Sequence, residues 1–122
     1  MYEWHNKKYY GAAHGIIGIL FVLLQAGEKY ITEDIMKDYI KPSIDYLKSK
    51  MYPSGNVPSS HGSENDKLIH WCHGAPGGIH LFLLSSHSVK FGHFFDFKVL
   101  YKIIMQCCLQ QHFYNYSDGT IF

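Results

Sequence analysis

Two runs of this chain would be apolar on every face of a helix, and they constrain the fold more than any other feature. Every residue of Ile16–Leu24 except Gly18 has a large apolar side chain. Ile79–Leu84 leaves almost as little polar surface. We predict helices over His14–Ala26 and Pro76–Ser86 around these runs. A helix that is apolar all round must be buried all round, so both helices belong in an inner layer.

Two further segments have a single apolar stripe. Thr32–Lys50 is predicted to be amphipathic, with Thr32 as its N-terminal cap and a kink or break near Ile40 caused by Pro42. Phe95–Gln111 is predicted to be the fourth helix. The stripe of the first segment comprises Ile35, Met36, Tyr39, Ile40, Ile44, Leu47 and Met51. The stripe of the second comprises Val99, Leu100, Ile103, Ile104, Cys107 and Cys108.

The order of these segments favours an all-α fold of about four helices. Inner helices alternate with amphipathic ones, as a two-layered α/α barrel requires. We therefore expect Ile16–Leu24 and Ile79–Leu84 to be more buried than Ile35–Met51. Pro53–Lys67 is dense in turn residues and is predicted to be a loop, either functional or a disordered connection. The tail Tyr114–Phe122 carries the turn signal Ser-Asp-Gly.

Composition excludes several classes of protein. The formal net charge of +1 and the lack of a basic cluster argue against nucleic-acid binding. Three cysteines, two of them adjacent, do not make a disulfide framework and fit a reducing compartment. Met1–Tyr10 is not a signal peptide, and no apolar run reaches the length of a membrane span. We expect a soluble, intracellular protein.

A repeated motif precedes both predicted inner helices. His14-Gly15-x-x-Gly18 and His73-Gly74-x-x-Gly77 share the pattern His-Gly-x-x-Gly, and the two histidines are 59 positions apart. The unit that repeats is therefore a helical hairpin with its connecting loop. If the two inner helices are neighbours, we expect His14, Cys72 and His73 to meet at one end of the fold. His14 and Cys72 are then expected to face a common cleft.

The chemistry of these residues leaves two readings open. A cysteine before a helix N-terminus is biased toward the thiolate, which is the form that binds metal. Cys72 beside His73 could be part of a zinc site, although one hairpin does not supply a full ligand set. The simpler reading of Cys72 is a buried structural thiol.

These motifs resemble those of the eukaryotic LanC-like proteins, relatives of the bacterial lanthionine cyclases. The resemblance rests on Gly11–Ile19, on the Trp-Cys-His-Gly-Ala-Pro-Gly run of Trp71–Gly77, and on Lys41–Tyr46 and Tyr52–Asn56. It covers roughly Tyr2 to Leu84, and little likeness is evident from Ser85 onward.

The resemblance implies a toroid of helical hairpins around one zinc ion. Cys72 takes the place of the first zinc ligand, and His14 that of the histidine that acts as acid or base. His73 is not expected to bind the metal. The implied reaction adds the thiol of glutathione to dehydroalanine or dehydrobutyrine residues of damaged proteins. The implied location is cytoplasmic, with peripheral association with the plasma membrane as a second expectation.

The chain also departs from the family pattern. It has no second Cys-His-Gly motif, because Cys107-Cys108 is followed by Leu109. Two hairpins cannot close a toroid, so residues 1–122 are expected to form a partial LanC-like domain with an exposed apolar patch. We expect the isolated chain to bind zinc weakly and to add no glutathione. Whether it is an enzyme stays open, with a non-catalytic glutathione- or zinc-binding protein and an inactive truncated product as the alternatives.

Overall fold

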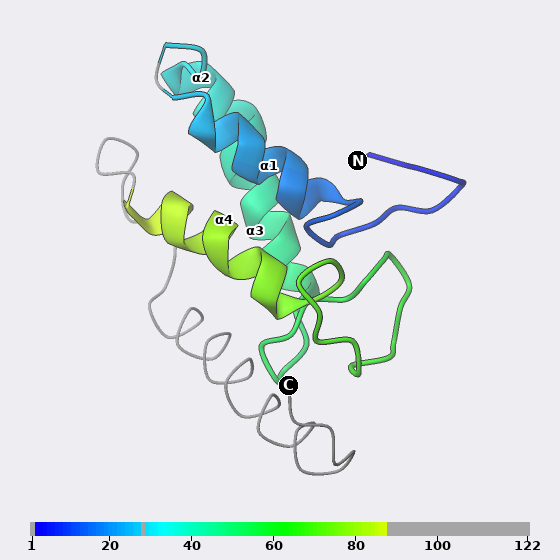
Figure 1. The fold of residues 1–122 in the computed structure, drawn as a ribbon. Helices are drawn as coiled ribbons and strands as arrows, with labels where there is room; N and C mark the ends of the chain where they lie inside the picture. The colour runs from blue at the N-terminus through cyan, green and yellow to red at the C-terminus, as the bar shows by residue number, and fades with distance from the viewer. Residues whose placement is uncertain (1, 28, 88–122) are drawn as a thin grey trace, which may run out of the picture.

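The computed structural model describes residues 2–27 and 29–87, and the predicted helix Phe95–Gln111 and the tail lie outside them. The described part is helical (Figure 1). Within it the backbone forms no strand and only two isolated bridges, Trp4 with Lys7 and Tyr9 with Ser60. Its elements are α1 (Ile16–Gln25), α2 (Glu33–Ile35), the π-helix η1 (Met36–Ile40), α3 (Lys41–Lys50) and α4 (Ala75–His87).

The two predicted inner helices, α1 and α4, pack against each other and begin at the same end of the fold (Figure 1). Ile17 of α1 and Phe82 of α4 are fully buried between them. The helix that includes α3 adds its own apolar stripe to the same core, so one hydrophobic cluster unites all the helices. Its fully or nearly fully buried members are Tyr10, Ile17, Leu20, Ile31, Met36, Ile40, Ile44, Leu47, Val57, Ala75, Leu81, Phe82.

The prediction that the first helix is buried all round is wrong for α1. Ile17 and Leu20 are buried, whereas Ile19 is 37%, Leu23 41% and Val22 64% exposed. Only one side of α1 packs on other parts of the described chain, and its opposite side is an apolar face in contact with solvent. In α4, by contrast, Leu81 and Phe82 are completely buried. The expected apolar patch is therefore present, and α1 carries it.

The amphipathic helix is continuous from Glu33 to Lys50 across α2, η1 and α3. Thr32 caps it as predicted, since its Oγ1 accepts a hydrogen bond of 3.4 Å from the backbone N–H of Ile35. Pro42 neither ends nor breaks the helix. The backbone widens into the π-helical turn η1 just before it, where the N–H of Lys41 donates to the carbonyl of Met36. A π-turn relieves the clash that a proline ring makes with the preceding α-turn.

Tyr10 joins three segments that are distant in sequence. Its side chain is 1% exposed, and its hydroxyl lies 3.1 Å from the Tyr46 hydroxyl on α3 and 2.9 Å from Nδ1 of His61 in the loop. Burial raises the pKa of Tyr10, and its hydrogen bond with Tyr46 acts in the same direction. The neutral phenol therefore persists and fixes the segment before α1 to both α3 and the loop.

The Pro53–Lys67 loop is not a disordered connection in this structure. Asn56 and Val57 are each 1% exposed, and Ser60 is 5% exposed. The Tyr52 hydroxyl donates to the Ser63 carbonyl at 2.7 Å, which closes the loop on itself. A buried polar side chain must be hydrogen-bonded for the loop to fold, and the Asn56 amide bonds to Asp66, Leu68 and Ala75. As for membranes, none of the described helices is both long and apolar enough to span a bilayer.

The two sides of α1 allow a matched test of this packing. We expect Leu20→Ala to lower the free energy of unfolding by about 2–5 kcal/mol, because Leu20 is 3% exposed and truncation leaves a cavity. Leu23→Ala, the same change one turn further along the same helix, should cost less than about 1 kcal/mol because Leu23 is 41% exposed. Urea denaturation of both variants measures the difference. Equal losses would contradict the assignment of the two faces.

Candidate functional site

The predicted sequence repeat is also a structural repeat. A Cβ placed on Gly18 would overlap the carbonyl oxygen of Ala12, and a Cβ on Gly77 would overlap that of Trp71. Both pairs are 59 positions apart, as His14 and His73 are. Each helix therefore begins from the same tight turn, in which the backbone passes too close to the helix for any side chain on the glycine.

The two turns touch each other through their backbones. The N–H of Ala13 donates to the carbonyl of Cys72 over 3.5 Å. A Cβ on Gly11 would overlap that same carbonyl oxygen. Because the first turn holds His14 and the second holds Cys72 and His73, this contact brings the three residues to one end of the fold, as the repeat predicts.

The histidine rings of the two turns belong to an aromatic cluster. The centroids of His14 and His73 are 6.0 Å apart. Tyr9 lies beside both, at 6.3 Å from His14 and 6.4 Å from His73. The nearest ring to His14 is that of Trp4, which stacks on it at 4.9 Å with an interplanar angle of 24°. Stacking on an indole limits the orientations open to the His14 imidazole.

Sequence reasoning missed Trp4. A tight turn holds it in place, in which Trp4 and Lys7 exchange two backbone hydrogen bonds of 2.9 and 3.0 Å. The two residues between them, His5 and Asn6, have φ angles of 50° and 58°, as the two central positions of a type I′ turn require. Asn tolerates this conformation better than most residues, so Asn6 was the available signal.

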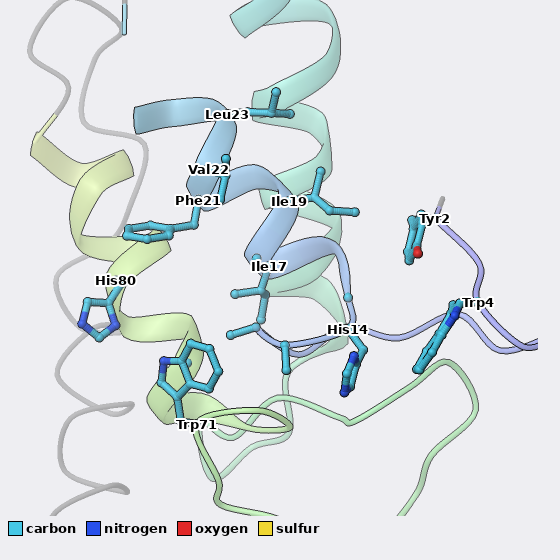
Figure 2. A pocket seen from close by; sticks show the side chains of 15 residues that line it. Tyr2, Trp4, His14, Ile17, Ile19, Phe21, Val22, Leu23, Trp71 and His80 are labelled. Carbon is cyan, nitrogen blue, oxygen red and sulfur yellow. The ribbon is translucent and has the colours of Figure 1, made fainter. Parts of the chain in front are cut away.

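A cleft of about 940 Å³ opens at this end of the fold, along α1 and the start of α4 (Figure 2). His14 and Trp4 line one part of it, and Trp71 and His80 line another. The exposed residues Ile19, Val22 and Leu23 of α1 continue its wall. No Asp, Glu, Lys or Arg is among its described lining residues, so the wall is mainly apolar and aromatic and includes the side chains of His14 and His80.

Cys72 does not line this cleft, so the expected common cleft contains His14 alone of the two residues. Cys72 is a half-buried free thiol. Beside it, Nδ1 of His73 is buried without a hydrogen-bond partner. In residues 2–27 and 29–87, no three His, Cys, Asp or Glu side chains gather closely enough to hold a metal ion. The described residues therefore supply one expected zinc ligand but do not themselves fit a catalytic zinc site.

A family model described as lanthionine synthetase C-like protein matches residues 1–119. The chain belongs to this family. The match extends past Leu84, beyond which the sequence motifs show little resemblance to the family. With the family established, the described helices are a part of its α/α toroid.

Two curated relatives agree with this assignment. "Glutathione S-transferase LANCL1" of Danio rerio is 42% identical over 83 residues, which is 68% of this chain and 20% of that protein. "LanC-like protein GCL1" of Arabidopsis thaliana is 41% identical over 78 residues, which is 63% of this chain and 17% of that protein. The matched region thus spans about a fifth of each relative's length.

The contact between the two turns can be tested at Gly11. We expect Gly11→Ala to separate the turns, because its Cβ would overlap the Cys72 carbonyl. The backbone amide signals of Cys72 and His73 should shift in NMR spectra, and the free energy of unfolding should fall by about 1–3 kcal/mol. Gly62→Ala is the control: its positive φ brings backbone strain, but its Cβ would meet no atom. Unchanged Cys72 signals in Gly11→Ala would contradict the contact.

The stack on His14 gives a second prediction. The indole of Trp4 should shift the ring protons of His14 upfield, so Trp4→Leu should move these NMR signals downfield. Trp71→Leu is the matched control, because Trp71 lines the same cleft but does not contact His14 among the described ring pairs. Equal shifts in the two variants would exclude a specific stack between Trp4 and His14.

Proposed function

We propose that this chain carries two of the active-site turns of a LanC-like thiol-addition protein. In this reaction the thiol of glutathione adds to dehydroalanine or dehydrobutyrine residues of proteins or peptides. Membership of the family supports the proposal, and so does the name of the zebrafish relative, a glutathione S-transferase. Because the match covers a fifth of that relative, the proposal concerns this chain's contribution to the site.

The observation that carries the proposal is the direct contact between the two turns. It brings the expected base, His14, next to the turn that holds the expected thiolate ligand, Cys72. If the turns before α1 and α4 lay apart, these two residue types would not be close together. His14 also faces an open cleft, which a proton-transfer group must do to reach a substrate.

The reaction needs one proton to be moved. The thiol loses its proton, its sulfur forms a bond to the β-carbon, and the π electrons of the double bond move into an enolate. The enolate then takes a proton at the α-carbon, so the sum of thiol and alkene gives a thioether. A histidine can accept the first proton and return it in the last step, because imidazole changes charge near neutral pH. We assign this role to His14.

The cleft suits the acceptor better than the thiol. Its described wall is apolar and aromatic, which fits an uncharged dehydrated residue and the side chains next to it. The stack with Trp4 holds the imidazole at the edge of that wall. Zinc at Cys72 remains a proposal, since its other ligands must come from residues outside the described ranges.

A graft tests the proposal. The 83 matched residues of this chain replace the corresponding segment of the Danio rerio relative. We expect the folded chimera to add glutathione to a dehydroalanine peptide. His14→Gln in the graft should lower kcat by about 10²–10⁴-fold, the usual contribution of general acid–base catalysis. Cys72→Ser should lower the zinc content. Mass spectrometry of the peptide and metal analysis are the readouts.

His70→Gln is the matched control, because His70 is an exposed histidine within the turn that holds Cys72. It should leave kcat unchanged. A folded chimera that binds glutathione without turnover would favour the non-catalytic alternative. Full activity in His14→Gln would show that the base is another residue.

A further inference from the structure

The side chain of Asn56 lies inside the turn that holds Cys72. Asn56 is 1% exposed. Its Oδ1 accepts a hydrogen bond of 2.9 Å from the backbone N–H of Ala75, the first residue of α4. Its Nδ2 donates to the carbonyl of Leu68 at 3.2 Å and to Oδ1 of Asp66 at 2.9 Å. Both ends of this amide are therefore satisfied in a buried place.

The equivalent turn before α1 is built without such a side chain. There the N–H of Ile16 donates directly to the carbonyl of Tyr9 over 3.2 Å. Ala75 and Leu68 are the residues 59 positions further along the chain. In the second repeat the same two backbone groups both bond to Asn56 instead of to each other. One carboxamide thus lies between a donor and an acceptor that meet directly in the first repeat.

Asn56 thus bridges the two ends of the turn from Leu68 to Ala75. A carboxamide between the two backbone groups holds them further apart than a direct hydrogen bond does. Gly74 leaves space for both groups, since a Cβ there would lie 2.5 Å from the Leu68 carbonyl oxygen and 3.1 Å from Oδ1 of Asn56. Cys72 and His73 lie within the turn that Asn56 bridges, whereas His14 lies within the turn that is bonded directly.

Asp66 fixes which way the amide faces. Its Oδ1 accepts from Nδ2 of Asn56, and its Oδ2 accepts from the Ser54 hydroxyl at 2.7 Å. An ionised carboxylate only accepts hydrogen bonds, so the NH₂ group of Asn56 must face Asp66 and its oxygen must face Ala75. The Ser54 hydroxyl also accepts from the backbone N–H of Asn56 at 3.2 Å.

We propose that Asn56, oriented by Asp66, is a positioning residue that sets the width of the Cys72 turn and thereby the placement of the Cys72 thiol. This inference rests on the proposed function in so far as it makes that thiol the functional group. The alternative is that Asn56 only stabilises the start of α4 and that the placement of the Cys72 thiol does not depend on it.

Exchanging the two side chains separates these readings. Asn56→Asp keeps the size of the side chain and the acceptor for Ala75, but it sets two carboxylates against each other and removes the donor to Leu68. In Asn56→Asp/Asp66→Asn the amide at position 66 restores a donor between the two side chains. Both variants and the wild type are prepared as the full chain at neutral pH.

Three readouts follow the two turns separately. Hydrogen exchange of the Ala75 amide reports the second turn, and that of the Ile16 amide reports the first turn as an internal control. The NMR amide shifts of Cys72 and His73 report the local conformation. The alkylation rate of Cys72 by iodoacetamide, measured by mass spectrometry against the peptide of Cys107 and Cys108, reports access to the thiol.

We expect Asn56→Asp to speed Ala75 exchange about tenfold, as the loss of roughly one buried hydrogen bond would. Cys72 should be alkylated several-fold faster and its amide signal should shift, while Ile16 exchange changes by less than about twofold, since the first turn lacks this side chain. The double variant should return the Cys72 values part of the way toward those of the wild type, because the repulsion between the two carboxylates is removed while the donor to Leu68 stays missing. If the single variant does not fold, a folded double variant with Cys72 values that approach those of the wild type supports the proposal.

Three results would overturn it. Cys72 could keep its shift and alkylation rate while Ala75 loses protection. Ile16 and Ala75 could lose protection together, which would make Asn56 a general stabiliser. The double variant could fail to fold or to restore Cys72 in part. These readouts require no catalysis, so failure of the graft to add glutathione would count against the proposed function and leave the result for Asn56 intact.

Discussion

The fold of this chain depends on one close backbone contact, that of Gly11 with the carbonyl of Cys72. The contact fixes the start of α1 against the start of α4, and the two helices pack on each other with Ile17 and Phe82 fully buried. Because backbone meets backbone there, the distance between the turns does not depend on flexible side chains. The positions of the two chemically reactive side chains, His14 and Cys72, follow from that contact.

Much of this arrangement could be predicted from the sequence. Hydrophobic periodicity predicted the helices of the described residues to within a few positions, because the apolar runs are long and Thr32 and Gly27 mark their ends. The predicted helix Phe95–Gln111 stays a prediction. The repeated His-Gly-x-x-Gly predicted that the two turns meet if α1 and α4 are neighbours, and the structure shows both the packing of the helices and the contact of the turns. The family followed from the run around Cys72, and the family model confirms it.

Other features depend on partners that a linear pattern does not show. The exposed side of α1 has the composition of a core, and only the absence of packing partners in the described chain makes Val22 a surface residue. The π-turn before Pro42 is one of several ways a helix can tolerate a proline, and the sequence does not choose among them. In the sequence Asn56 is one of several turn-forming residues. Only the structure shows that it is buried and bonds to Ala75, 19 residues further along the chain.

Electrostatic steering of an anionic thiol cannot come from the described wall of the cleft. Oppositely charged walls raise association rates and make them sensitive to ionic strength. The described residues that line this cleft include neither Lys nor Arg, so encounter along this wall depends on contact with apolar and aromatic surface. An uncharged acceptor would then approach past Trp4 and Trp71 at a rate that added salt leaves nearly unchanged.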